Sequence, residues 1–158
     1  MKKSSSQISI TELANKAGVS RRIFYRHFKS KEDILIYQLS KISNEYYHRL
    51  VNAHLLDTYI IAEIFFTACY NHLSFLKALH KQKLMFFLFY EINKLLPLLH
   101  KNVVTKEFDE KFQNNIAYVI SFQAGGFWSI LNHRIENEAN ISPKEIAKIL
   151  SDINLQLI

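Results

Sequence analysis

The chain has 158 residues, of which 49% are hydrophobic and 13% aromatic, with one cysteine, three glycines and two prolines. This composition is apolar enough for a folded core, and so few turn-forming residues favour an all-α protein over a β-sandwich, which needs a turn about every ten positions. The formal net charge is +6, and residues 1–50 carry all of it, because they contain ten Lys/Arg and four Asp/Glu. Residues 51–158 contain ten of each and are therefore neutral.

The basic excess surrounds two predicted short helices that a tight turn joins, within residues 8–35. A basic module followed by a neutral one is typical of nucleic-acid-binding proteins. Ser9 and Glu12 form a capping box at the start of the first helix, and apolar residues follow at helical spacing. Gly18 supplies the left-handed residue that the turn needs, and Ser20 caps the second helix. Helix, glycine turn and basic helix together predict a helix-turn-helix.

The second predicted helix carries the residues best suited to reading DNA. In a helix-turn-helix, this helix lies in the major groove with its N-terminal residues against base edges. Arg21 and Arg22 stand at that position, and arginine recognises guanine through two hydrogen bonds. We therefore expect both arginines to read bases, and we expect Ser20 and Thr11 to donate hydrogen bonds to phosphates.

The segment ITELANKAGVSRRIFYRHFKSKEDIL resembles the DNA-binding signature of TetR-type transcriptional repressors, through AGVS, FYRHF and KSKEDIL in fixed spacing. The resemblance implies a double-stranded DNA operator as partner. It also implies that Arg26 either touches DNA or pairs with an acid on the following helix, and that a hydroxyl contact is lost where Ile23 replaces the family's usual threonine. The residues that it implies as phosphate contacts are Tyr25, His27, Lys29 and Lys31.

TetR-type proteins also carry a helix before the helix-turn-helix, which closes the small DNA-binding core from behind. Residues 1–7 read MKKSSSQ and leave no room for it, so we expect this module to lack its usual first helix. Because MKKSSSQ resembles the Lys-rich end of that helix, one hypothesis is that Met1 is an internal or misassigned start. The residues expected to lose part of their cover are Ile8, Ile10, Leu13, Ile23 and Phe24.

A helix from residue 31 to about 53, which Ser30 and Asp33 begin with a second capping pattern, is expected to join two domains. We place the DNA-binding domain at residues 1–50 and a helical ligand-binding or dimerisation domain at 51–158. The next predicted helix begins at 57 or 58 and ends near 71, and a shorter helix follows it and ends at 80. A third runs from 83 to about 100, and Pro97 either bends or ends it. The last two run from 106 to about 134 and from 140 to 158, with Ser142 as the cap and Pro143 at the first helical position.

Aromatic side chains are concentrated in the second domain, and we expect them to form its interior. Two interpretations stay open, because the TetR resemblance implies an inducer pocket in the helical bundle, whereas ordinary core packing needs the same residue types. The candidate pocket residues are Tyr59, Phe66, Tyr70, Phe86, Tyr90 and Tyr118.

Gly125 and Gly126 lie within the helix predicted to end near residue 134. Each glycine costs a helix about 1 kcal/mol relative to alanine, which is tolerated where another helix must approach closely. The segment YVISFQAGGFWSILNHRIENEANISPKEIAKIL also resembles the C-terminal helices of the dihydroxyacetone-kinase regulator subgroup. We expect a homodimer interface of two helices from each subunit, formed by Phe122, Gly125, Gly126, Trp128, Ile146, Ile149, Leu150 and Ile153.

Catalytic and metal-binding patterns are not evident in the sequence. The histidines lack i, i+4 pairing, and we find no nucleophile–base arrangement, phosphate loop or carboxylate pair, so we expect neither a metal nor a cofactor nor an enzyme. The single Cys69 allows no intrachain disulfide and suits a buried position in a cytoplasmic protein. The longest apolar run, residues 84–99, is interrupted by polar residues and too short to span a bilayer, so we expect no membrane partner.

These patterns predict a DNA-binding transcription regulator that represses by binding a palindromic operator as a homodimer. A small-molecule inducer or a protein co-regulator acting at the helical domain would control it. A dimer would let two reading helices bind half-sites about 34–36 Å apart. The alternative is an interaction protein or co-activator, whose shortened helix-turn-helix binds DNA weakly or not at all.

Overall fold

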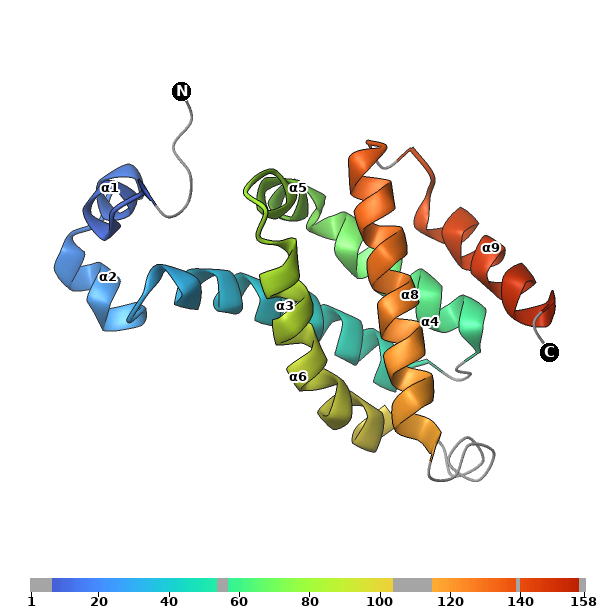
Figure 1. Ribbon diagram of the computed structural model, residues 1–158. Coiled ribbons are helices and arrows are strands. Elements are labelled where there is room, and N and C mark those ends of the chain that lie inside the picture. Colours follow the sequence, from blue (N-terminus) through green and yellow to red (C-terminus); the bar gives the residue numbers. More distant parts are fainter. Residues whose placement is uncertain (1–6, 54–56, 104–114, 139, 157–158) are drawn as a thin grey trace. The chain divides into compact units, whose positions relative to one another are not determined.

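The computed structural model describes residues 7–53, 57–103, 115–138 and 140–156, and Figure 1 shows the helices that they form. These residues contain eight helices and no strand, so the all-α prediction is confirmed. The chain divides into two compact units, Met1–Lys41 (unit 1) and Ile42–Ile158 (unit 2), with the division inside helix α3. No helix in the described ranges has the length and apolar character needed to cross a membrane.

Unit 1 begins with α1 (Ile10–Lys16) and α2 (Arg21–His27), which lie against each other (Figure 1). The predicted capping box is present: the Ser9 N–H donates to Glu12 Oε2 at 2.8 Å, and the Glu12 N–H donates to Ser9 Oγ at 3.2 Å. Gly18 has a φ of 68°, a left-handed conformation that favours glycine. The Ile23 N–H donates to Ser20 Oγ at 3.2 Å, so Ser20 caps α2 as predicted. These local signals confirm the helix-turn-helix.

Helix α3 (Lys31–Val51) closes the small core of unit 1. Ala14, Phe24 and Leu39 are buried, and they come from α1, α2 and α3. The Phe28 ring lies 5.9 Å from both Phe24 and Tyr37, which links the end of α2 to α3. Phe24 is thus covered by neighbours within unit 1, whereas Ile23 on the other side of α2 is exposed.

Asp33 holds the start of α3 through three hydrogen bonds. Its carboxylate accepts from the Lys29 N–H at 2.6 Å, the Ser30 N–H at 3.2 Å and the Ser30 hydroxyl at 3.1 Å. The Asp33 N–H donates to Ser30 Oγ at 3.2 Å, which confirms the second capping pattern. The hydrogen bond from the Lys29 N–H is the main reason that the pKa of Asp33 lies below its ordinary value of 3.8. A lowered pKa means that folding favours the charged carboxylate.

We expect Asp33→Asn to destabilise the start of α3 at neutral pH and to remove a pH dependence of the wild type. Because the pKa of Asp33 is lower in the folded chain, its contribution is complete above pH 3.8 and is lost as the pH falls through the folded value. The difference in amide exchange of unit 1 between wild type and variant should therefore shrink in acid. Glu32→Gln, in the same first turn, is the control. An equal effect of Glu32→Gln would contradict a specific role of Asp33.

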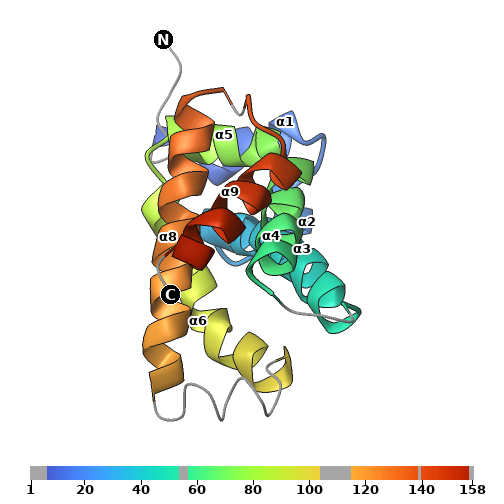
Figure 2. The ribbon, with the colours of Figure 1, turned by 90° about the vertical axis from the view of Figure 1, so that its right-hand side faces the viewer.

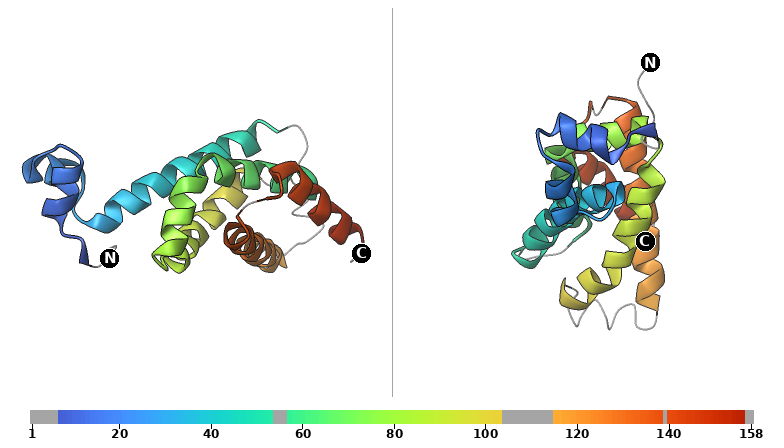
Figure 3. Two further views of the ribbon diagram at one scale, coloured as in Figure 1. Left: turned by 90° about the horizontal axis from the view of Figure 1, so that it is seen from above. Right: turned by 90° about the vertical axis from the view of Figure 1, so that its left-hand side faces the viewer.

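Unit 2 contains the rest of α3 together with α4 (Thr58–Asn71), α5 (Leu73–Lys81), α6 (Met85–Val103), α8 (Ile116–Glu136) and α9 (Pro143–Gln156). Helix α9 lies along α4, and Figures 2 and 3 show the two side by side. Helix α5 contacts α4, α6 and α8, and α6 lies beside α8. The largest fully buried side chains of the described residues are Phe66, Leu76, Leu88 and Leu131. They place the core of unit 2 between α4, α5, α6 and α8.

The helix bounds agree closely with the sequence-based predictions. Helix α4 begins after Asp57, whose Oδ1 accepts from the Ile60 N–H at 2.8 Å, and α9 begins after Ser142, which exchanges two hydrogen bonds with Glu145. Helix α6 continues through Pro97 to Val103, so the alternative that Pro97 ends this helix is wrong. The expected start of the next helix at residue 106 lies outside the described residues.

Candidate nucleic-acid interface

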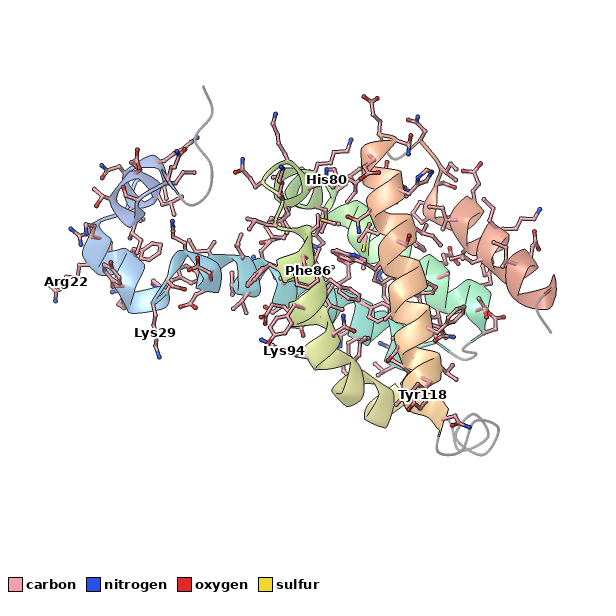
Figure 4. All side chains as sticks on the ribbon, viewed as in Figure 1. Arg22, Lys29, His80, Phe86, Lys94 and Tyr118 are labelled. Atoms are coloured by element: carbon pink, nitrogen blue, oxygen red, sulfur yellow. The ribbon has the colours of Figure 1, made fainter. Side chains whose placement is uncertain are left out.

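Arg21 and Arg22 are the first two residues of α2, directly after the cap Ser20. Both are exposed, and Figure 4 shows Arg22 pointing away from the ribbon. None of the ion pairs within the described residues involves either arginine. Their guanidinium groups are therefore available to a ligand, and arginine offers a planar fork of N–H donors that matches guanine or phosphate.

The packing of Phe24 determines which face of α2 is exposed. Phe24 is buried against Phe28, and its ring meets the Tyr25 ring edge-on at 5.5 Å. The residues on either side of it in the helix therefore face outward. Arg22 and Arg26 are one turn apart on that outward face, and both are exposed. Since the first turn of α2 contains no acidic residue, no carboxylate there opposes an incoming phosphate.

The predicted phosphate contacts have different surroundings. Thr11, Ser20, Tyr25, His27 and Lys29 are exposed, and Figure 4 shows Lys29 pointing away from the ribbon. The Ser20 hydroxyl already accepts a hydrogen bond as a cap, but its own hydrogen can still be donated.

Lys31 and Arg26 differ in whether they have a partner among the described residues. Lys31 is half-buried, and its Nζ donates to the Ile8 carbonyl at 2.8 Å, so it ties the segment before α1 to α3. A phosphate would have to compete with this hydrogen bond. Arg26 was expected to contact either DNA or an acid on the following helix, and no ion pair of the described residues involves it.

The aromatic residues proposed as pocket candidates do not form one buried group. Phe66 is fully buried and Tyr59 half-buried, but Tyr70, Phe86, Tyr90 and Tyr118 are exposed. Figure 4 shows Phe86 on α6 and Tyr118 near the start of α8. The prediction that all of these residues lie in the interior is therefore wrong for those four. Helical spacing cannot distinguish two aromatic faces of one helix, of which only one packs inward. Binding of an inducer near them stays a prediction.

The residues proposed for a homodimer interface also differ in exposure. Phe122 is 78% exposed, and Gly126, Ile149 and Ile153 are exposed, whereas Gly125 and Leu150 are half-buried. Trp128 packs within the chain, with its ring 5.0 Å from Phe89. Ile146 is buried and cannot reach a partner, because α9 lies along α4. This corrects the expected position of Ile146.

Gly125 and Gly126 were expected where another helix approaches closely. A Cβ atom built on either glycine would meet nothing within 4 Å, so no described part of this chain is such a neighbour. Among the residues that the structure describes, no three His, Cys, Asp or Glu side chains are grouped so as to hold a metal ion.

Comparison with known proteins bears on the N-terminal segment alone. Residues 3–37 match the family model described as bacterial regulatory proteins, tetR family. The matched segment contains α1, α2 and the first part of α3, together with every residue that we name as a candidate DNA contact. The match supports a DNA-binding transcription regulator of the TetR type. The resemblance of the C-terminal helices to the dihydroxyacetone-kinase regulator subgroup lies outside the match and stays a prediction. Neither curated proteins nor solved structures gave a match.

Proposed function

We propose that the protein is a repressor that binds a palindromic DNA operator as a homodimer and that a signal acting on unit 2 controls it. The observation that carries this proposal is a pair of exposed arginines at the start of α2, within the segment that matches the TetR family, and neither forms an ion pair with any residue that the structure describes. In a helix-turn-helix these positions meet base edges in the major groove. The net charge of +6 concentrated in residues 1–50 favours binding to the phosphate backbone.

DNA binding can be tested without knowledge of the operator. Duplexes that the full chain retains are selected from a random pool, and the dissociation constant of the selected sequence is then measured over a range of salt concentrations. We expect a palindromic sequence bound at least about 10³-fold more tightly than random duplex, with affinity falling steeply as salt rises. Failure to bind any duplex at low salt would contradict the proposal. It would favour the alternative of an interaction protein.

The homodimer is supported by the outward face of α8. Tyr118, Phe122 and Gly126 are spaced four residues apart and therefore lie on one side of this helix. All three are exposed, and the two aromatic rings are more than three-quarters exposed. Exposed aromatic side chains grouped on one face are typical of protein interfaces. The open space above Gly126 would allow the α8 helix of a second copy to approach closely.

We expect Phe122→Glu to convert the dimer to a monomer, because it places a charge in the centre of this apolar face. The control is Phe86→Glu, because Phe86 on α6 is the same residue type and nearly as exposed, at 75% compared with 78%. Sedimentation velocity gives the oligomeric state of both variants. If Phe86→Glu dissociates the dimer and Phe122→Glu does not, the interface lies over α6 and the assignment to α8 is wrong.

Control by a signal requires that the signal bind one state of the protein more tightly than another. A ligand of unit 2 that prefers a dimer unable to match the operator would release the protein from DNA. A ligand that binds both states equally would have no effect on operator affinity.

A further inference from the structure

Arg134, in the last turn of α8, is the one buried charged side chain among the described residues. Only 5% of its surface is exposed. Its Nε donates a hydrogen bond to the Ile141 carbonyl at 2.9 Å, in the segment that leads into α9. Its Nη1 and Nη2 are inaccessible to solvent and have no hydrogen-bond acceptor in the described part of the chain. Four N–H donors of a cation are thus left without an acceptor.

The neighbours of Arg134 do not balance its charge. The Tyr70 ring lies over the guanidinium, with its centroid 5.4 Å from Cζ, and supplies an aromatic face but no anion. Cys69 lies close enough to interact electrostatically with Arg134, but burial raises the pKa of its thiol to about 12, so the thiol is neutral at neutral pH. Burial likewise lowers the pKa of Arg134, although guanidinium stays protonated in proteins.

Two carboxylates of unit 2, those of Glu45 and Glu136, have partners of their own. Glu45 pairs with Arg49 at 3.1 Å and with His72 at 3.3 Å, and Glu136 pairs with His80 at 3.3 Å. Figure 4 labels His80, which lies on α5. Because a buried charge without a partner is strongly unfavourable, proteins seldom retain one without a further use for it. The unpaired donors of Arg134 therefore point to an acceptor from outside the chain.

We propose that Arg134 is the anchor of a binding site for a small carboxylate. The two Nη groups of a guanidinium form a planar fork that binds both oxygens of a carboxylate at once. Ile141, to which Arg134 donates, directly precedes the cap Ser142 of the 14-residue helix α9.

Tyr70 provides the route to the guanidinium. Its side chain is 51% exposed at the end of α4, although its ring covers Arg134. Because Nη1 and Nη2 are inaccessible as the chain stands, a carboxylate reaches them only when a neighbouring side chain moves, and Tyr70 is a partly exposed neighbour whose ring can turn outward into solvent. Binding would then exchange a ring–cation contact for two charge-assisted hydrogen bonds. The site itself does not depend on the proposed DNA-binding function. If that function also holds, a carboxylate is the signal that acts on unit 2.

The test uses the full chain without DNA, and sodium acetate as the probe against sodium chloride at equal ionic strength. We expect acetate to raise the melting temperature of the wild type and to shift the Arg134 Nε–Hε resonance of ¹⁵N-labelled protein. Arg134→Lys keeps the charge but not the fork, and should weaken acetate binding about tenfold or more. Tyr70→Ala should strengthen binding, because it removes the cover. The resonance shift tests the wild type even if a variant fails to fold.

Several results would overturn the proposal. An unchanged melting temperature and resonance in acetate would show that no carboxylate reaches Arg134. Equal acetate effects in wild type and Arg134→Lys would place binding elsewhere. A response to inorganic phosphate but not to acetate would contradict the carboxylate class. Loss of DNA binding leaves each of these results interpretable, because none of them is measured on DNA.

Discussion

Replacing Arg21 and Arg22 together by alanine should abolish sequence-specific operator binding while the fold stays intact. Each guanidinium that binds guanine through two hydrogen bonds contributes about 1–3 kcal/mol of discrimination. Because the proposed homodimer contains four of these guanidinium groups, their loss should weaken operator binding by roughly 10³-fold or more. The fold should stay intact, because both side chains are exposed and form no ion pair in the described ranges, and alanine favours helix formation at least as well as arginine.

The comparison of operator with random duplex shows how the arginines act. If they read bases, the double variant loses its preference for the operator but keeps weak, salt-sensitive binding to any duplex. If they contact phosphates alone, binding to operator and random duplex falls equally. The control is Lys144→Ala with Lys148→Ala, which removes the same charge from two exposed positions of α9. A control that weakens operator binding as much would contradict base reading.

The helix-turn-helix was predictable because its signals are local. Ser9 with Glu12, Ser20 with Ile23, and Ser30 with Asp33 are each linked by a hydrogen bond across three residues. Such hydrogen bonds depend on residue type and spacing and on little else, so a single sequence contains the information for them. The left-handed φ of Gly18 is predictable for the same reason.

The surface of unit 2 was less predictable because it depends on which helices meet. Phe86, Tyr90 and Tyr118 have the residue type of a core, and they are exposed because no described helix covers their faces of α6 and α8. Tyr70 is also exposed, although its ring contacts Arg134 of α8. Ile146 has the same apolar character as Ile149, yet α9 packs along α4 in a way that buries the first and exposes the second. Spacing along a helix gives its faces but not their partners.

Arg134 was missed, although a signal for it exists. It follows Phe127 by seven residues and Leu131 by three, so helical spacing places it on the buried side of α8. A charge on an apolar face is a candidate functional residue for that reason alone. What the sequence could not supply is the absence of a counter-charge, since that depends on how α4, α8 and the segment before α9 come together.

Phe66→Ala should have the largest effect on stability of any single substitution considered in unit 2. Phe66 is fully buried, with its ring 5.0 Å from Phe65 on the same helix and 5.6 Å from Phe127 on α8. Truncating such a side chain removes its transfer free energy and leaves a cavity, at a cost of about 3–5 kcal/mol. Because the free energy of unfolding of a small domain is only about 5–15 kcal/mol, this loss is a large part of the stability of unit 2.

Urea denaturation of unit 2, followed by circular dichroism or by Trp128 fluorescence, measures this loss. The matched control is Phe86→Ala, which removes the same atoms from a position that is 75% exposed and should change stability by only about 0.5 kcal/mol or less. A similar loss for both variants would mean that Phe86 is covered in solution. Since Phe86 lies on α6, the most direct cover would be a second copy, and the loss would then depend on protein concentration. Stability measured at two concentrations therefore separates burial within the chain from burial between chains.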